Sequence, residues 1–574
     1  MIGEIESVDT RRVAVHVADE AISGIQVNQL VWIRSTYVNE RIVGIVTRIT
    51  RRALKDRLTA DDEEKDEELA SGDIENSVLV ELIGTWRIGT VVDYTRRDEK
   101  DVGVFRRSLD VVPSIGADVD VLLGDELTAF MRSLTAGCAA PLHLGSYAIA
   151  KNVPADVDGN RFFQRHVVVV GSTGSGKSYT VATILEQASG LNSPNVIVFD
   201  LHGEYAPLAG DQIQHLKIAG PADNATDENA LFLPYWLFSY DEIEVFLLNR
   251  RDTNAPNQAR AMTDCILAEK QAWRSGKVGV GENEEDEIDI TVESPVPYKF
   301  SNLIRTLEDE KGCEKYCTTK DGKTKLATLT ARLKSRMADR RLNFVFNESP
   351  KLLKRGWLDD LVRQLMGFGG TSRGIKIIDF SEVPSDVLPF ATALVSRLVF
   401  SLQMWTPEEV RHPISLFCDE AHLYMADDMD GGVGGLSARS FSRIAREGRK
   451  YGLSLVVISQ RPSELDKTII SQCGTFVAMR LTNAEDQNAI RRLFPDNMGS
   501  VAESLPVLDV GEAIVVGDAC PVPSRIRIQL PSICPKSPTI DVWSRWGGSE
   551  VKEFDVKRTI AAMRSQQRNE GRSK

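Results

Sequence analysis

The sequence predicts an α/β protein in which a parallel-sheet core follows a small N-terminal β-barrel and is interrupted by a helical insertion. Short segments that alternate apolar and polar residues fill the first quarter of the chain, as half-buried strands require. From about residue 160, continuous apolar runs alternate with helical segments, which is typical of a parallel sheet covered on both faces. Between two of these runs lies a long interval that shows helical spacing.

The N-terminal region, residues 1–150, is rich in Val and Ile and is expected to form the barrel. Turn-prone residues separate its strand candidates, which are RRVAVHVAD, GIQVNQLVWIRS, ERIVGIVTRITRR and SVLVELIGTWRIGTVVDYTRR. Several short strands of this kind suggest a small barrel. An acidic run that begins at Asp61, DDEEKDEEL, interrupts the set and is expected to be a solvated loop.

The core is expected in two pieces, residues 151–234 and 371–530. Its strand candidates, most of them continuous apolar runs, are His166–Val170, Asn195–Phe199, Ile375–Asp379, Ile414–Cys418, Leu453–Ser459, Thr475–Leu481 and Glu512–Val516. Segments with helical spacing make residues 235–370 a helical insertion, which an acidic loop, GENEEDEID, divides. Residues 531–574 are expected to form a C-terminal extension with a helix near Phe554–Arg564 and a polar, basic end.

Length and composition restrict the function classes. The chain has 574 residues, enough for three or four structural units at roughly 150 residues each. Its net charge of −13 argues against a surface coated in nucleic acid, but not against DNA held in one local basic channel. No apolar run is expected to approach the roughly 18 residues that span a bilayer, and the N-terminus lacks the apolar core of a signal peptide. We therefore expect a cytoplasmic protein that has no membrane partner.

A glycine-rich loop lies between an apolar strand and a helix candidate. Gly171, Gly176, Lys177 and Ser178 fit the pattern G-x-x-x-x-G-K-[ST], the P-loop that cradles the phosphates of a nucleoside triphosphate. Lys177 should reach the β- and γ-phosphates, and the Ser178 hydroxyl should ligate Mg²⁺. The residues expected to bind ATP are Gly171, Ser172, Thr173, Gly174, Ser175, Gly176, Lys177, Ser178 and Tyr179.

Acidic and amide side chains follow other core strands. ISLFCDEAH delivers Asp419 to the end of a strand, where it should hold Mg²⁺ directly or through water. Glu420, beside it, is the preferred general base for the attacking water. VIVFDLHGEY presents Asp200 and Glu204 at the same edge, so that Glu204 is a competing base. Gln460, at the tip of SLVVISQRP, suits a sensor that reads the γ-phosphate or holds a water, and a strand-capping amide is the alternative.

A basic segment, Arg439–Lys450, follows the second acidic motif. Five basic residues against Glu447 give it a local charge of +4 in an acidic chain. If this segment is helical, its spacing places three arginines on one face of the helix: Arg439, Arg443 and Arg446. These arginines suit either a finger inserted into a neighbour's site or contacts with nucleic-acid phosphates, and a solvated basic helix is the third interpretation. Arg165, just before the P-loop strand, is a second candidate for action on a neighbour.

The motifs occur in an order that resembles the HerA branch of the HerA/FtsK superfamily of DNA-translocating ATPases. They are RHVVVVGSTGSGKS, FDLHGEY, DEAHLY, IAREGRKYG, SQRP and GEAIVVG. The P-loop alone would be unspecific, whereas the ordered set is specific, and the resemblance covers nearly the whole chain. It implies a RecA-like P-loop ATPase core, an N-terminal barrel like the HAS barrel of that family, and the helical insertion.

Members of that family are hexameric rings that move double-stranded DNA through a central pore. The resemblance therefore implies a homohexamer with ATP and Mg²⁺ at its subunit interfaces. The residues to which it assigns roles there are Lys177, Ser178, Asp419 and Glu420 of one protomer, and Arg446, with Arg165, of the next. Arg439 is the best candidate for a pore contact. A partner effector, which would be a NurA-like nuclease, a sirtuin-like NADase or another nuclease, should dock on the barrel, in DNA-end processing or antiphage defence.

A second function class stays open. The chain could be a ring-shaped ATPase scaffold that assembles and gates a partner enzyme without moving DNA, because both activities would use the same nucleotide site. A translocase predicts hydrolysis that duplex DNA stimulates and that salt weakens, whereas a scaffold predicts stimulation by the partner protein.

Overall fold

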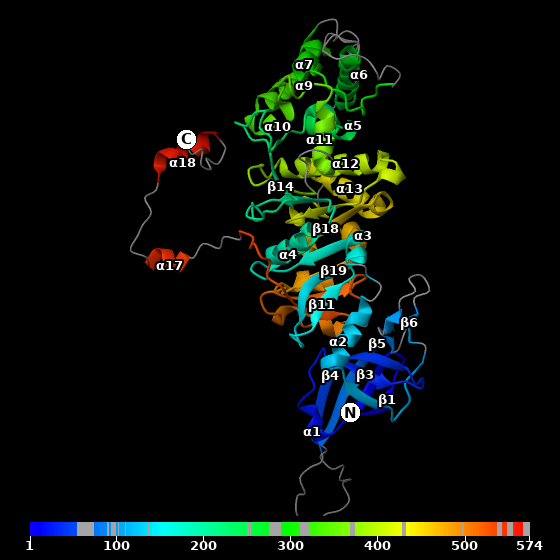
Figure 1. Ribbon diagram of the computed structural model, residues 1–574. Helices are drawn as coiled ribbons and strands as arrows, with labels where there is room; N and C mark the ends of the chain where they lie inside the picture. The colour runs from blue at the N-terminus through cyan, green and yellow to red at the C-terminus, as the bar shows by residue number, and fades with distance from the viewer. Residues whose placement is uncertain are drawn as a thin grey trace, which may run out of the picture. The chain divides into compact units, whose positions relative to one another are not determined.

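In the computed structural model the chain forms two compact units. Figure 1 shows their helices and strands, coloured from the N-terminus to the C-terminus. It describes residues 1–53, 74–88, 91–92, 99–100, 103–109, 111–135, 138, 140–248, 252, 254–274, 289–309, 322–367, 374–427, 432–494, 499–536, 542–547 and 555–565. The first unit comprises Met1–Gln187, Arg461–Ser463 and Gly474–Leu530, and the second comprises Ala188–Gln460, Glu464–Cys473 and Pro531–Lys574. The acidic run at 61–69 and residues 281–288 of the acidic loop lie outside the described residues.

The first unit begins with a closed antiparallel barrel, as the alternating pattern predicts. Its strands are, in spatial order, β2 (Arg12–Val17), β1 (Gly3–Val8), β9 (Asp118–Val121), β3 (Leu30–Arg34), β4 (Glu40–Ala53) and β5 (Ile74–Arg87). Strand β5 pairs back with β2 and closes the ring, while β8 (Val104–Arg106) pairs with β5. The register between β4 and β5 shifts at two points, and such irregularities bend long strands around a small barrel.

The barrel core is aliphatic. Val13, Val15 and Val17 of β2 are buried and alternate with half-buried or exposed residues, so that one face of the strand points inward. The other elements of this region are α1 (Asp19–Ile22), β6 (Val91–Val92), β7 (Glu99–Lys100) and α2 (Gly124–Leu134).

A second sheet of the first unit carries the P-loop strand. Its strands are, in order, β11 (Pro154–Val157), β10 (Leu142–Tyr147), β21 (Ser524–Ile528), β20 (Glu512–Gly517), β19 (Cys473–Met479) and β12 (His166–Val170). Strand β10 lies before residue 150, where we expected the barrel to end, yet it pairs with β21 of this sheet. The helices of this part are α3 (Gly159–Gln164), α4 (Lys177–Ser189), α15 (Ala484–Arg491), α16 (Gly499–Ala502) and the 3-10 turn η8 (Leu505–Val507).

The second unit contains a parallel sheet. Its strands are, in order, β18 (Leu453–Ser459), β17 (Ile414–Cys418), β13 (Val196–Asp200), β16 (Ile375–Asp379), β14 (Ile213–Ile218) and β15 (Ala230–Leu231). Strands β17, β13 and β18 are buried along their whole length, as their continuous apolar sequences predict. Because these strands run parallel, their carboxyl ends meet at one edge. That edge positions the candidate site.

Helix α12 (Leu388–Trp405) packs against α13 (Gly432–Glu447) in the same unit. With 18 residues and a mean hydropathy of 1.2, α12 is long and apolar enough to cross a membrane, which corrects our expectation that no apolar run approaches that length. Since 67% of it is buried inside the fold, α12 has the packing of a core helix. The short elements nearby are η3 (Glu408–Val410), η4 (Ala421–Leu423), η5 (Gly448–Tyr451), η6 (Pro462–Glu464) and α14 (Lys467–Ser471).

The insertion is helical, as its spacing predicts. It contains η1 (Tyr235–Leu237), α5 (Tyr240–Leu247), α6 (Ala255–Arg274), α7 (Phe300–Glu308), α9 (Gly322–Ala338), η2 (Arg340–Leu342), α10 (Asn343–Phe346) and α11 (Trp357–Met366). Figure 1 shows α6, α7 and α9 bundled together, in agreement with their contacts. Ser239 caps α5 in a capping box with Glu242, which explains where this helix begins.

In the described part of the C-terminal extension, two short helices follow the core. They are α17 (Val542–Gly547) and α18 (Val556–Ser565), the second within two residues of the expected helix. Neither contains a buried residue.

Candidate nucleotide site

The P-loop joins β12 to α4, and α4 begins at Lys177. Gly174 and Gly176 have φ angles of 74° and 110°, in the region that favours glycine. A Cβ atom on Gly176 would lie 3.0 Å from Met479 Cε, so the loop passes close to β19. Lys177 is buried, and its Nζ donates a hydrogen bond to the Gly171 carbonyl at 2.8 Å. The lysine is thus held inside the curve of the loop.

Neighbouring segments of the first unit hold the P-loop in place. The Ser172 N–H donates to the Arg480 carbonyl at 2.8 Å, and the Gly511 N–H donates to the Ser175 carbonyl at 2.9 Å. The Ser172 hydroxyl also lies 3.3 Å from that of Thr482. A loop anchored in this way presents preorganised N–H groups to an anion. Three other residues expected to bind the nucleotide lie on the loop or the first turn of α4 and are exposed or half-buried: Thr173, Ser178 and Tyr179.

Acidic side chains gather in the second unit at the carboxyl ends of β13 and β17. Asp200 is the last residue of β13, and Asp419 and Glu420 directly follow β17. All three are at least 95% buried. Asp200 accepts hydrogen bonds from the N–H groups of Glu204 and Tyr205, each at 3.0 Å, which fixes the turn that carries Glu204.

Burial and mutual repulsion control the charges of this cluster. Burial raises the pKa of Asp419 well above its ordinary value, and the charges of Glu420, Asp200 and Glu204 raise it further. Burial also raises the pKa of Asp200 to about 6, with a further contribution from Asp379. A cation placed among these carboxylates would offset both effects.

Gln460 contacts the expected base directly. Its Nε2 donates a hydrogen bond to Glu420 Oε1. The sequence led us to expect that this amide would read the γ-phosphate, hold a water or cap its strand. The sequence did not predict its contact with Glu420, which lies forty residues earlier in the chain. The contact forms because β17 and β18 are parallel neighbours whose carboxyl ends lie side by side.

Two further polar residues near the cluster were not singled out from the sequence. Asp379 ends β16 and lies in register with Asp200 of β13. The signal was available, because IKIID ends in an acid just as VIVFD does. His422 lies in the same DEAH string as Glu420, and its Nδ1 is 3.4 Å from Glu420 Oε2.

The arginines of α13 are exposed along one side of the helix, in agreement with the expected spacing. The Arg443 guanidinium lies 4.7 Å from the centre of the Phe400 ring. The Arg446 Nε donates to the Ser442 carbonyl at 3.2 Å within its own helix. Arg165, the second candidate finger, instead forms an ion pair with Asp518 inside the first unit.

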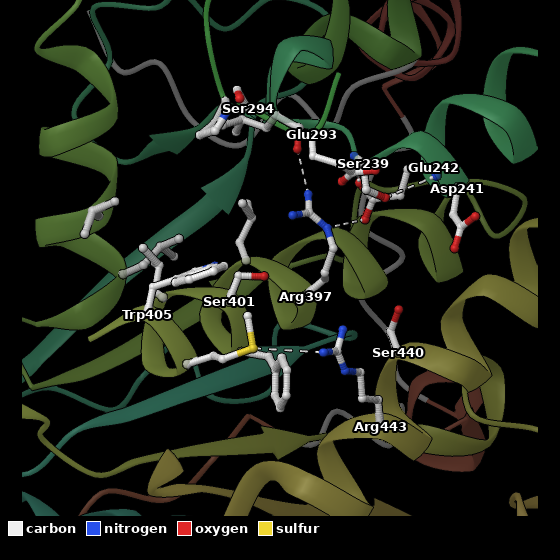
Figure 2. A pocket seen from close by; sticks show the side chains of 18 of the residues that line it. Ser239, Asp241, Glu242, Glu293, Ser294, Arg397, Ser401, Trp405, Ser440 and Arg443 are labelled. Carbon is white, nitrogen blue, oxygen red and sulfur yellow. Dashed lines mark hydrogen bonds and ion pairs between the residues drawn. The ribbon is translucent and has the colours of Figure 1, made fainter. Parts of the chain in front are cut away.

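A cavity of about 750 Å³ opens beside α13 in the second unit (Figure 2). Elements α5, α11, α12 and α13 and the segment 291–295 supply its walls. Figure 2 shows Arg397 and Trp405 of α12 and Arg443 of α13 around it. Arg439, our candidate for a pore contact, also lines it. Among the described residues, neither the P-loop nor the acidic cluster contributes to this wall.

Comparison with known proteins shows which family the chain resembles. Residues 142–399 match the family model described as Helicase HerA, central domain. The "DNA double-strand break repair helicase HerA" of Sulfolobus acidocaldarius is 24% identical over 78% of this chain and 80% of that protein. Its namesake from Saccharolobus solfataricus is 27% identical over 68% of each chain. The chain is similar to the HerA helicases.

Two further similarities involve proteins with other names. The "Probable helicase MJ1565" of Methanocaldococcus jannaschii is 24% identical, and the match covers 67% of this chain and 66% of that protein, slightly under two thirds of its length. The plasmid coupling protein TrwB, solved with a GTP analogue, is 13% identical over 73% of this chain and 95% of its own, with a TM-score of 0.45. The complete P-loop, together with these similarities, makes the chain a P-loop ATPase.

Proposed function

We propose that this chain is a ring-forming motor that uses ATP hydrolysis to translocate double-stranded DNA. The observation that carries the proposal is the buried cluster of Asp200, Asp419 and Glu420 in a chain that has a complete P-loop and resembles the HerA helicases. Similar proteins are named DNA repair helicases, which favours DNA as the substrate.

The side chains fit ATP with Mg²⁺. Hydroxyl and carboxylate oxygens are the ligands that Mg²⁺ prefers, and Ser178 and Asp419 would supply them. Glu420 Oε2 is buried and accepts no hydrogen bond from the part of the chain that the structure describes, as suits an oxygen that receives a proton from water. The bound ion would neutralise charge on the phosphates. Lys177 would bind the β- and γ-phosphates, and Glu420, in preference to Glu204, would act as general base.

The exposed arginines of α13 would serve the assembled ring. We assign Arg446 to a finger that reaches the nucleotide of the neighbouring protomer in a homohexamer, with Arg165 as the alternative. Because Arg165 is paired with Asp518, it would first have to leave that carboxylate. Arg439 would contact DNA phosphates, which gives binding that ignores sequence and weakens with salt.

A partner effector completes the proposal. We infer a NurA-like nuclease, a sirtuin-like NADase or another nuclease, docked on the N-terminal barrel of this cytoplasmic motor. DNA-end processing and antiphage defence are the two settings in which such a pair would act.

Steady-state ATP hydrolysis tests the proposal. The purified protein is assayed alone and with long linear duplex DNA at low and moderate salt, with Lys177→Ala as the inactive control. We expect DNA to stimulate hydrolysis and added salt to reduce the stimulation steeply. Hydrolysis that ignores DNA at every salt concentration would contradict translocation and favour the scaffold, in which case the partner protein should stimulate instead.

A further inference from the structure

The backbone at Glu420 has an uncommon conformation. With φ 43° and ψ 44°, Glu420 adopts the left-handed conformation, and Asn28 is the only other described non-glycine residue with a positive φ angle. This conformation costs roughly 1–2 kcal/mol for a residue with a Cβ atom. It ends β17 abruptly and starts the turn η4, which brings His422 back beside the Glu420 carboxylate. Strain of this kind at a chemically active residue indicates a constraint on where its side chain points.

The two oxygens of the Glu420 carboxylate have different surroundings. Oε1 accepts the hydrogen bond from Gln460 Nε2. No described residue donates a hydrogen bond to Oε2, although this oxygen is buried. Since an oxygen that already accepts a donor is a weaker proton acceptor, Oε2 is the atom that would take the proton from the attacking water.

His422 faces that second oxygen. Its Nδ1 lies 3.4 Å from Glu420 Oε2 and 3.3 Å from the hydroxyl of Ser459, the last residue of β18. Both distances are slightly longer than a typical hydrogen bond, so the ring nitrogen lies beside Oε2 without saturating it. The His422 side chain is 15% exposed and is therefore confined between the η4 turn and β18.

We propose that His422 is a positioning residue for Glu420: its ring, which contacts Ser459, lies against the carboxylate and keeps Oε2 facing the attacking water. The proposal rests on the assignment of Glu420 as general base under the proposed function. It gives the final residue of the DEAH string a role that needs neither nucleotide nor DNA contact. Gln460 and His422 then hold the carboxylate from its two sides, both through groups at the ends of β17 and β18.

Removal of the ring nitrogen should affect the chemical step alone. His422→Leu should lower kcat for ATP by roughly 10- to 100-fold, because a small misplacement of a catalytic group can cost about two powers of ten. The KM for ATP and the thermal unfolding midpoint should stay at wild-type values. His422→Asn should restore most of kcat, since the Asn amide nitrogen occupies nearly the place of Nδ1.

His412 provides a matched control. It lies just before β17, at the opposite end of the same strand, where its Nε2 contacts the Ser193 carbonyl at 2.9 Å. His412→Leu should leave kcat unchanged. Ser459→Ala should give a smaller loss of kcat than His422→Leu, because the ring keeps its nitrogen but loses the hydroxyl beside it.

Hydrolysis is measured without DNA, so the result does not depend on translocation. Wild-type kcat in His422→Leu would overturn the proposal, as would equal losses in the Leu and Asn variants, which would indicate a packing role. Glu420→Gln belongs in the same series. If that variant hydrolysed ATP normally, the base assignment in the proposed function would fall, and with it the role of His422. If Glu420→Gln were inactive and His422→Leu normal, only the present proposal would fail.

Discussion

At the scale of single residues, Glu420 and Glu204 compete for the role of base, and their surroundings differ. Glu420 is 5% exposed and held by Gln460, whereas Glu204 is half-buried in a turn that Asp200 organises. Glu420→Gln should retain ATP binding and lose hydrolysis by roughly 10²- to 10⁴-fold, the range of a general base. Glu204→Gln is the matched control and should stay within a few-fold of wild type. A normal rate in the first variant together with loss in the second would reverse the assignment.

The buried side chain of Lys376 should make the stability of the fold depend on pH. It is fully buried in β16, where its Nζ donates to Asn195 Oδ1 at 2.6 Å and to the Gly374 carbonyl at 3.1 Å. Burial lowers the pKa of Lys376 from 10.5 to about 7. Between these pH values the unfolded chain binds a proton that the folded chain has released, so the free energy of unfolding rises with pH. Below about pH 7 both states hold the proton, and Lys376 no longer makes stability depend on pH.

Urea unfolding of the wild type and of Lys376→Met measures this effect. Loss of the amine also leaves two oxygens without their donor, so the variant should be less stable overall. The decisive quantity is the slope. Between pH 7 and pH 9 the wild type should gain on the variant by up to about 1.4 kcal/mol per pH unit. A difference that is constant with pH would show that the pKa of Lys376 is not lowered.

The sequence predicted the positions of the site residues better than the contacts between them. An apolar strand followed by glycines and Lys-Ser indicates the P-loop. An acidic residue at the end of an apolar run indicates Asp419 and Asp200. The roles of these residues remain predictions. Contacts such as Gln460 with Glu420, or Arg165 with Asp518, were out of reach, because they join residues that are adjacent only once the sheets have formed.

At the scale of elements, a buried ion pair ties the insertion to the core of the second unit. Arg397 of α12 pairs with Glu242 of α5 at 2.6 Å and donates to the Leu237 carbonyl at 2.7 Å. The Glu242 side chain is only 1% exposed, so removing its partner would leave a buried charge uncompensated. Arg397→Met should therefore destabilise the docking of α5 by about 3 kcal/mol.

Hydrogen exchange of the α5 amides reports this loss locally, and a second arginine supplies the comparison. Arg443 of α13 lies 3.6 Å from Glu447, but both side chains are more than 40% exposed. An exposed pair of this kind contributes about 0–1 kcal/mol, so Arg443→Met should leave exchange in α5 nearly unchanged. Equal exchange in the two variants would mean that the α5–α12 pair is not what fixes this helix.

Elements with one strong pattern were predictable, and those decided by pairing were not. The apolar runs of β12, β16, β17 and β18 were located with the bounds that the structure has. Strand β14, IQHLKI, was overlooked because its polar residues resemble a loop, although it lies between β16 and the short β15. Strand β10 reads as part of the barrel sequence, and only its pairing with β21 assigns it elsewhere.

At the scale of the whole molecule, an acidic chain is proposed to bind a polyanion. The net charge of −13 would oppose this in general, yet α13 and the segment after it concentrate five basic residues against one acid. The same helix would have to serve both DNA and the neighbouring nucleotide site. An arginine finger has no function within a single protomer, so its role is tested in the assembled ring.

Mixing two inactive variants decides whether the arginine acts on a neighbour. Arg446→Ala lacks the finger but keeps its own Lys177, while Lys177→Ala keeps the finger. In a mixed ring, some interfaces pair an intact P-loop with an intact arginine, and others hold both defects. We expect each variant alone to be inactive and the mixture to recover part of the hydrolysis, since a finger supplied by a neighbour can contribute about 10³- to 10⁵-fold in rate. Arg165→Ala replaces Arg446→Ala in a parallel series. Recovery in that series alone would move the finger to Arg165, and an Arg446→Ala protein that hydrolysed ATP at the wild-type rate would remove α13 from the nucleotide site.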